Sequence, residues 1–297
     1  MLRMGRRGLL AMGPVLGGML VVPWSRHLSG WMPANDAGAF VPMVVLTLMA
    51  GVMVVGSGGG KGGVRGLSVA IRAASRMMPC MIPLGIAVLT VVMVAGSGDF
   101  LAIAQRQAAG GYLWLAFQDP FCASACVLFF LANTSCLRAM RGWSDNDVMA
   151  HGMALVFCAV QAALWLGAWY DPFGGIAQLE KASQPNAFEF SIGLAFAADM
   201  VGLAVFAAKV AFLMAVQRFV AGVWVERDVR GVFQRVLPWS LGILLAEGAY
   251  LWLAAPLGDV QTAIQWVLAV VGWVGVVWLA GVMLWSERPS ARLSARG

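Results

Sequence analysis

The sequence predicts an all-α integral membrane protein, a single-domain bundle of about eight transmembrane helices. Of its 297 residues, 61% are hydrophobic and only 11% are charged, and the mean hydropathy is +0.81. A soluble domain of this length needs far more charge to cover its surface, so the surplus of apolar residues requires lipid as its solvent. The net charge of +6 does not favour a nucleic-acid partner, because the cations lie between apolar runs, where they orient membrane helices.

Apolar windows long enough to cross a bilayer recur along the whole chain, with short loops between them. The first window could pass for a signal peptide, but it continues to Pro23 without a clear cleavage site, so we expect a retained helix. The sixth window is long and is expected to tilt. The expected spans are residues 8–24, 37–56, 78–96, 111–132, 148–170, 190–216, 236–255 and 263–285.

The distribution of cations predicts the orientation of this bundle. With the N-terminus inside, only Arg26, Arg106 and Lys181 fall in outer loops, and Lys209 lies within a helix. This asymmetry is the positive-inside bias expected for an even number of spans with both termini on the cytoplasmic side. The inner segments hold Arg3, Arg6, Arg7, Lys61, Arg65, Arg72, Arg76, Arg138, Arg141, Arg218, Arg227, Arg230, Arg235, Arg288, Arg292 and Arg296.

No motif predicts a bound nucleotide, metal or redox cofactor. The glycine-rich segment 56–63 has Val55 where a phosphate-binding loop needs its first glycine, and Gly62 where it needs Ser or Thr. His27 and His151 fall on opposite sides of the membrane and cannot share a metal. The cysteines show no iron–sulfur or zinc spacing and are expected to be helix-packing residues. They are Cys80, Cys122, Cys126, Cys136 and Cys158.

Three ionisable residues lie inside expected spans: Asp199 and Lys209 in window 190–216, and Glu247 in window 236–255. A charge at mid-bilayer costs at least about 2.5 kcal/mol, so such groups usually pair inside the bundle or line an ion path. One hypothesis is a proton path in which Glu247 lies between the other two. The alternative is a single structural pair of Lys209 and Glu247. Counting along the helices places Lys209 nearest the inner surface.

The inner loops also carry arginines interspersed with acids, a mixture that suits a protein interface better than bare lipid. Orientation and contact with anionic lipid are the alternative explanation of the same residues. The candidates for docking a peripheral subunit, or for the rim of an amphiphilic substrate site, are Arg72, Arg76, Arg138, Arg141, Glu226 and Arg227.

The chain resembles the H-type subunit (subunit 1) of respiratory NADH:quinone oxidoreductase, complex I, and the related membrane subunit of formate-hydrogenlyase-type hydrogenases. The segment GLLAMGPVLGGMLVVPW at residues 8–24 is similar to the family's second span. The loop from Gly66 to Arg72 precedes a long apolar run that ends in Gly98-Asp99-Phe100, as in the family. Lys209 and the stretch from Glu226 to Pro238 fit later parts of the pattern, so the resemblance extends from about Arg7 to Ala255.

The chain departs from the family's pattern at positions where the family carries acidic residues. Because residues 8–24 resemble the family's second span, we expect no counterpart of its first helix, and the family's glutamates fall on Met81 and near Gln161. The family's acid-rich loop is replaced by CLRAMRGWSDND, residues 136–147. The resemblance implies a subunit of an energy-transducing inner membrane, bacterial or mitochondrial, that joins the peripheral redox arm to the membrane arm. It also implies quinone as a substrate, no cofactor of its own, and partners that are other subunits and lipid. The alternatives are a stand-alone secondary transporter and a catalytically silent paralogue.

Overall fold

The computed structural model describes residues 15–16, 18–19, 22–24, 81–108, 114–118, 120–141, 147–182, 188–223, 238, 242 and 245–246. Every regular element within these residues is a helix, which confirms the predicted all-α class for the described part of the chain. The expected spans 37–56 and 263–285 lie outside the described residues. Only a few positions of the windows 8–24 and 236–255 lie inside them.

The helix Met81–Ala95 and the short helix α4, Phe100–Arg106, are joined by a sharp bend of 60°. Gly96 ends the first helix in the left-handed region, with φ of 65°, and its N–H donates to the carbonyl of Val92. Asp99 begins α4, because its carboxylate accepts from the N–H of Leu101. The side chain of Arg106 returns to the carbonyl of Val94, at 2.7 Å, and holds the two helices together.

The apolar run expected as a span at residues 111–132 is divided in the structure. A single-turn helix α5, Leu115–Gln118, is followed by the long helix α6, Pro120–Arg141. Proline is well suited to the first position of a helix, because the N–H that it lacks would have no intrahelical partner there. The helix therefore begins nine residues later than the expected window and extends nine residues beyond it.

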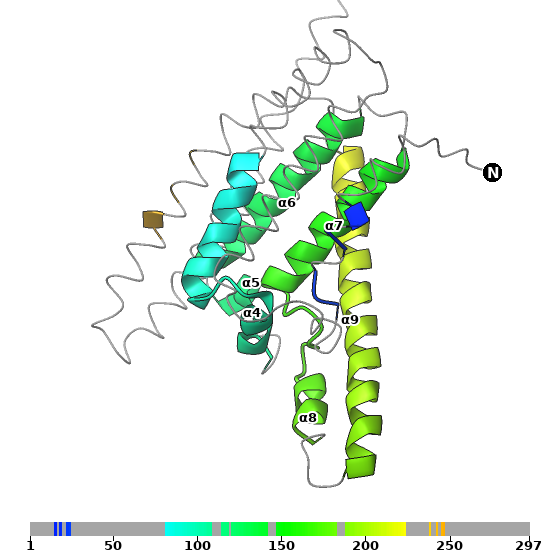
Figure 1. Ribbon diagram of the computed structural model, residues 1–297. Coiled ribbons are helices and arrows are strands. Elements are labelled where there is room, and N and C mark those ends of the chain that lie inside the picture. The colour runs from blue at the N-terminus through cyan, green and yellow to red at the C-terminus, as the bar shows by residue number, and fades with distance from the viewer. Residues whose placement is uncertain are drawn as a thin grey trace, which may run out of the picture.

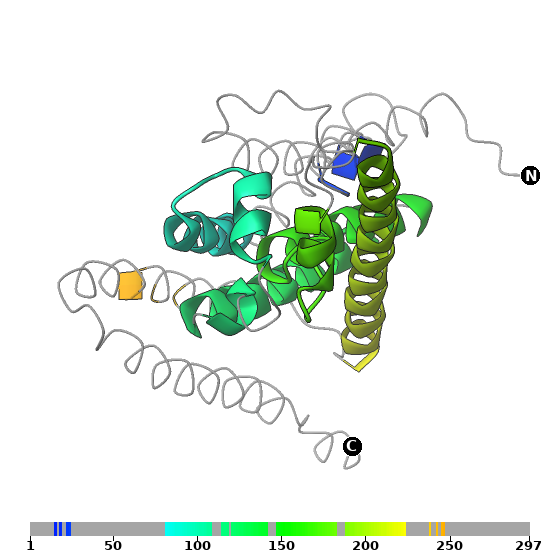
Figure 2. The ribbon, with the colours of Figure 1, turned by 90° about the horizontal axis from the view of Figure 1, so that it is seen from below.

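Three further helices follow: α7, Asp147–Trp165; α8, Gly175–Ala182; and α9, Phe188–Val223. The 36 residues of α9 correspond to about 54 Å at 1.5 Å per residue, which exceeds the hydrocarbon thickness of a bilayer. Figures 1 and 2 both show α8 beside α9, and the contacts between these helices agree. The expected window 148–170 stops being helical at Trp165, so its last residues form a loop.

The long described helices alternate in direction. In Figure 1 the helix Met81–Ala95 descends, α6 rises, α7 descends and α9 rises again. The ends near Met81, Arg141, Asp147 and Val223 therefore lie at one end of the bundle. The short helices α4, α5 and α8 lie toward the other end.

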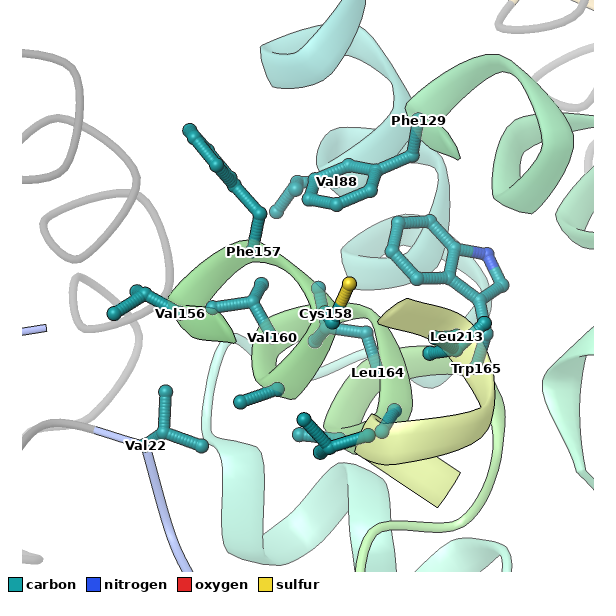
Figure 3. Close-up of a cluster of buried hydrophobic side chains, with 14 of the residues drawn as sticks. Val22, Val88, Phe129, Val156, Phe157, Cys158, Val160, Leu164, Trp165 and Leu213 are labelled. Carbon is teal, nitrogen blue, oxygen red and sulfur yellow. The ribbon is translucent and has the colours of Figure 1, made fainter. Parts of the chain in front are cut away.

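The buried core lies where the helix Met81–Ala95 and helices α6, α7 and α9 meet. Figure 3 shows its centre, in which Phe129 lies near Val88 and packs against both Phe157 and Trp165. The rings of Phe129 and Trp165 have centroids 5.1 Å apart.

The outer side of α9 carries large exposed apolar side chains such as Phe212 and Phe219. Among the described residues, Ala195–Val220 is long and apolar enough to cross a membrane. The bent pair at Met81–Arg106 passes the same test if it is one span.

Candidate functional site

The candidate site is the broken end of helix α7, residues Leu166 to Tyr170. This loop runs through the interior, where Ala168, Trp169 and Tyr170 are all buried. A buried loop carries backbone carbonyl and N–H groups that no helix satisfies, and each must find another partner. Two polar side chains, Lys209 of α9 and Gln107 just after α4, supply those partners.

Lys209 inserts its ammonium group into a cage of backbone carbonyls. The Nζ atom donates to the carbonyl oxygens of Leu166, Ala168 and Tyr170, at 2.6, 2.9 and 2.5 Å. An ammonium group has three N–H donors, so the three carbonyls match it in number. The Trp114 ring covers the same nitrogen, with its centroid 4.1 Å away, and the negative face of an aromatic ring favours a cation. We call this arrangement the carbonyl cage.

Gln107 holds the opposite side of the same loop. Its side chain is fully buried, and its Nε2 donates to the carbonyls of Ile103 and Leu164. Its Oε1 accepts from the N–H groups of Leu115, at 2.9 Å, and Gly167, at 3.1 Å. One amide thus uses both donors and both acceptor positions to join α4, the start of α5 and the end of α7.

Gly167 and Ala168 turn the backbone so that the carbonyls of the loop converge on Lys209. Gly167 has φ of 70° and Ala168 has φ of 46°. Only glycine adopts such angles readily, so the alanine is held in a costly conformation by its surroundings. A Cβ atom at Gly167 would also overlap Nε1 of Trp114. Glycine is therefore required here both for the turn and for the close approach of the tryptophan.

Asp171 connects the carbonyl cage to helix α8. Its carboxylate accepts from the N–H groups of Phe173, Gly175 and Ile176, at 3.2, 3.0 and 2.8 Å. Partial burial raises the pKa of this carboxyl, but the backbone hydrogen bonds outweigh burial and hold the pKa below its usual value. The ionised carboxylate also interacts favourably with the Lys209 ammonium.

The structure places some of the residues predicted as functional and leaves others outside the described part. Lys209 and Asp199 both lie on α9 and are half-buried, about 15 Å apart along the helix axis. Arg138 and Arg141 lie in the last turn of α6, and their side chains are outside the described part. The remaining predicted residues, Glu247, Arg72, Arg76, Glu226 and Arg227, lie outside the described residues.

Counting along the sequence predicted that Lys209 is the ionisable residue nearest the inner surface, and the structure shows which helix end it contacts. It contacts the residues that follow α7, at the end of that helix opposite Asp147. In the structure α9 continues to Val223, beyond the expected end at residue 216, and α7 stops early at Trp165. Since three carbonyls coordinate the ammonium, direct pairing with Glu247 would require Lys209 to give up one of these bonds.

The two positions where the resemblance places glutamates are buried in this chain. Met81 is part of the hydrophobic core. Gln161 of α7 donates through Nε2 to the carbonyl and the sulfur of Cys126 in α6, at 3.1 and 3.3 Å. The Oε1 atom of Gln161 has no hydrogen-bond partner among the described residues. Both positions therefore pack helices together and neither carries a charge.

Sequence reasoning found Lys209 but missed its surroundings. The carbonyl cage consists of backbone atoms, which no side-chain motif reveals. Gly167 inside the end of the expected span, with Pro172 and Gly174 just beyond it, was a usable signal for a break in the helix. Gln107 gave no comparable signal, since most of its partners are distant in the sequence and become visible only after folding.

Comparison with known proteins supports the resemblance read from the sequence. Residues 7–138 match the family model described as NADH dehydrogenase. The chain is 27% identical to the H-type subunit of NADH-quinone oxidoreductase from Desulfotalea psychrophila, in an alignment covering 56% of this chain and 57% of that protein. It is 26% identical to the subunit of the same name from Anaeromyxobacter dehalogenans, over 56% of this chain and 42% of that protein.

The resemblance to an H-type complex I subunit is thereby confirmed, at low identity and over part of the chain. The family match ends at residue 138, whereas the sequence pattern indicated a resemblance up to Ala255. The chain spans about half the length of the curated relatives that it matches. The site contains residues on both sides of the match's end, since Gln107 and Trp114 lie within the match and Lys209 lies beyond it.

Proposed function

We propose that this chain, which matches the NADH dehydrogenase family model over residues 7–138, is a membrane subunit of a complex I-like NADH:quinone oxidoreductase. In this role it links the peripheral redox arm to the membrane arm. The observation that carries the proposal is this match together with the two relatives that are H-type subunits of NADH-quinone oxidoreductase. A related hydrogenase assembly is the alternative setting for the same role. The chain itself binds no cofactor in this proposal, and quinone is the substrate of the assembly.

The proposed location is an energy-transducing inner membrane, as for the H-type relatives, with about eight spans and both termini on the cytoplasmic or matrix side. The cation count assigns the loops around Arg141 and after Val223 to the inside, and the loops around Arg106 and Lys181 to the outside. The ends of the described helices group in the same way, because the ends at Arg141, Asp147 and Val223 lie together at one end of the bundle (Figure 1). Charge and geometry thus favour one orientation.

Proton coupling in this subunit would use Lys209, Asp199 and Glu247. A buried cation is retained in an apolar interior only when polar groups compensate it, and such residues in membranes commonly mark ion paths. The carbonyl cage supplies that compensation for Lys209. The proposed path places Lys209 in the middle section of α9 and Asp199 nearer the outer end, with Glu247 completing it from the next expected span.

The docking surface for the redox arm is proposed to include Arg72, Arg76, Arg138, Arg141, Glu226 and Arg227. All of these belong to segments that the cation count places inside. The end of α6, which carries Arg138 and Arg141, lies at the same end of the bundle as the start of α7 and the end of α9. A peripheral subunit bound there would contact several helix ends at once.

A catalytically silent paralogue is the second candidate function. The observation that favours it is the neutral character of Met81 and Gln161, which pack in the interior where the resemblance places glutamates. Such a protein would anchor or seal a larger membrane complex without moving protons. A stand-alone secondary transporter is a further alternative, since transporters also expose backbone carbonyls at broken helices.

The test combines purification with a coupling assay. Gentle detergent extraction of the native membrane should recover the chain together with other redox subunits, whereas recovery as a lone homo-oligomer would favour a transporter. In vesicles that contain the assembly, Glu247→Gln should lower proton uptake driven by NADH. Unchanged proton uptake in a Glu247→Gln, Lys209→Met double variant would leave the silent role as the better account.

A further inference from the structure

We propose that the carbonyl cage is a preformed binding site for a primary ammonium ion, and that Lys209 occupies it as a cation tethered to α9. The direct evidence is the coordination of Nζ by the carbonyls of Leu166, Ala168 and Tyr170, with the Trp114 ring on a further side. If the cage exists independently of the lysine stem, then truncating Lys209 creates a vacancy that free ammonium or methylammonium fills. The cage has this property whether or not Lys209 moves protons.

The cage is held in place by groups other than Lys209. The N–H of Ala168 donates to the carbonyl of Ala162, and the N–H of Tyr170 donates to the carbonyl of Gly167. Gln107 fixes the N–H of Gly167 from the opposite side, at 3.1 Å. These bonds set the left-handed turn at Gly167 and Ala168 that aims the carbonyls inward. The loop should therefore keep its shape when the lysine side chain is removed and another cation replaces it.

Several described groups around the cage carry negative charge or negative partial charge toward the cation. The cage follows the C-terminus of α7, where the helix dipole concentrates negative partial charge. Three carbonyl oxygens and the face of Trp114 add to this, and the Asp171 carboxylate interacts favourably at longer range. An empty cage would leave buried carbonyls without hydrogen bonds, which is unfavourable for each of them.

The geometry also predicts which cations bind. Three carbonyls at 2.5–2.9 Å match three N–H donors, so ammonium and methylammonium can satisfy them all. Tetramethylammonium has the same charge but no N–H donor and a larger radius. It cannot donate a hydrogen bond to any of the three carbonyls. It is therefore a matched control for nonspecific salt effects.

The experiment uses the full-length Lys209→Ala variant in detergent or lipid nanodiscs, with thermal unfolding followed by tryptophan fluorescence. Methylammonium or ammonium chloride should raise the midpoint by at least about 2 °C relative to equal concentrations of tetramethylammonium chloride. The wild type should show no such difference, because the site is full. Arg218→Ala removes an exposed cation of the same helix and should behave like the wild type. Equal effects of methylammonium and tetramethylammonium on Lys209→Ala would overturn the proposal.

A second measurement applies even if the Lys209→Ala variant does not fold. The chain has only three lysines, Lys61, Lys181 and Lys209, so nitrogen-15 lysine labelling of the wild type gives a simple spectrum. The caged ammonium should give one NH3+ signal that exchanges slowly with solvent. Gln107→Leu, which frees the N–H of Gly167, should accelerate that exchange. A Lys209 signal with the same exchange rate in the wild type and in Gln107→Leu would contradict a cage shaped by the backbone.

Discussion

The amide of Gln107 is a single group on which three backbone segments depend. Replacing it with leucine keeps the approximate volume but leaves the N–H groups of Leu115 and Gly167 without their acceptor. A buried group that loses its partner costs about 1–3 kcal/mol, so Gln107→Leu should lower the free energy of unfolding by about 2–4 kcal/mol. Chemical unfolding in mixed micelles measures this change. Gln105→Leu, at an exposed position of the adjoining helix α4, is the control and should change little.

The lowered pKa of Asp171 predicts how the stability of the folded protein depends on pH. Because backbone hydrogen bonds hold its pKa below the usual value in the folded state, its contribution to stability is present at neutral pH. This contribution is lost as the pH falls through the depressed pKa, below about pH 4. Asp171→Ala should therefore be less stable than the wild type at pH 7, and the difference should shrink toward about pH 3. Thermal midpoints at several pH values measure this, and a constant difference would contradict the assignment.

At the scale of the element, the break after α7 depends on Gly167. Alanine at this position would place a Cβ against Nε1 of Trp114 and would strain a backbone with φ of 70°. Gly167→Ala should therefore destabilise the fold and displace Trp114 from the Lys209 ammonium, which thermal unfolding and tryptophan fluorescence would detect. Gly193 of α9 offers a matched control, because a Cβ there meets nothing within 4 Å. Gly193→Ala should stabilise slightly, by about 0.5–1 kcal/mol, since alanine favours helix.

Gln161 of α7 forms a side-chain hydrogen bond to α6. Gln161→Leu should cost little, because the carbonyl of Cys126 that it contacts lies in the middle of a helix and has a helical partner in addition. Gln161→Glu, which restores the residue type implied by the resemblance, should cost more, because a carboxylate would be buried without a cation beside it. Comparing the unfolding midpoints of the two variants measures the difference. Equal midpoints would show that the interior at this position already accommodates a charge.

Sequence reasoning predicted helices better than it predicted their interruptions. The apolar windows indicated helices near Met81–Ala95, α7 and α9, because long apolar runs have few alternatives in lipid. The expected window 78–96 ended at Gly96, but the break at Gly167 inside the window 148–170 was missed, although this glycine has a positive φ. A glycine inside an apolar run does not by itself show whether neighbouring helices restore the missing backbone bonds. In this chain Arg106, Gln107 and Lys209 restore them, and these pairings are not visible in the linear pattern.

At the scale of the whole molecule, α9 separates two environments. One side packs on the core through residues such as Phe206 and Val210, whereas Phe212 and Phe219 are exposed on the other. In the described part of the chain this apolar surface is therefore available to lipid or to a neighbouring subunit, as expected for part of a membrane assembly. Lys209 is placed between these two environments, and its ammonium is stabilised by the carbonyl cage on the core side.

The orientation of the bundle gives a prediction that involves the entire chain. Reporter fusions truncated after Arg141, after Arg227 and at Gly297 should give cytoplasmic signals, because these positions follow an even number of expected spans. Fusions after Arg106 and after Lys181 should give signals from the opposite side. The structure strengthens this expectation, since α4 and α8 lie at the end of the bundle opposite to Arg141 and Val223 (Figure 1).

A fluorescent protein that folds only in the cytoplasm, paired with a phosphatase that is active only outside, distinguishes the two sides. A phosphatase signal after Arg141 would reject the topology, and with it the proposal that Arg138 and Arg141 face the redox arm.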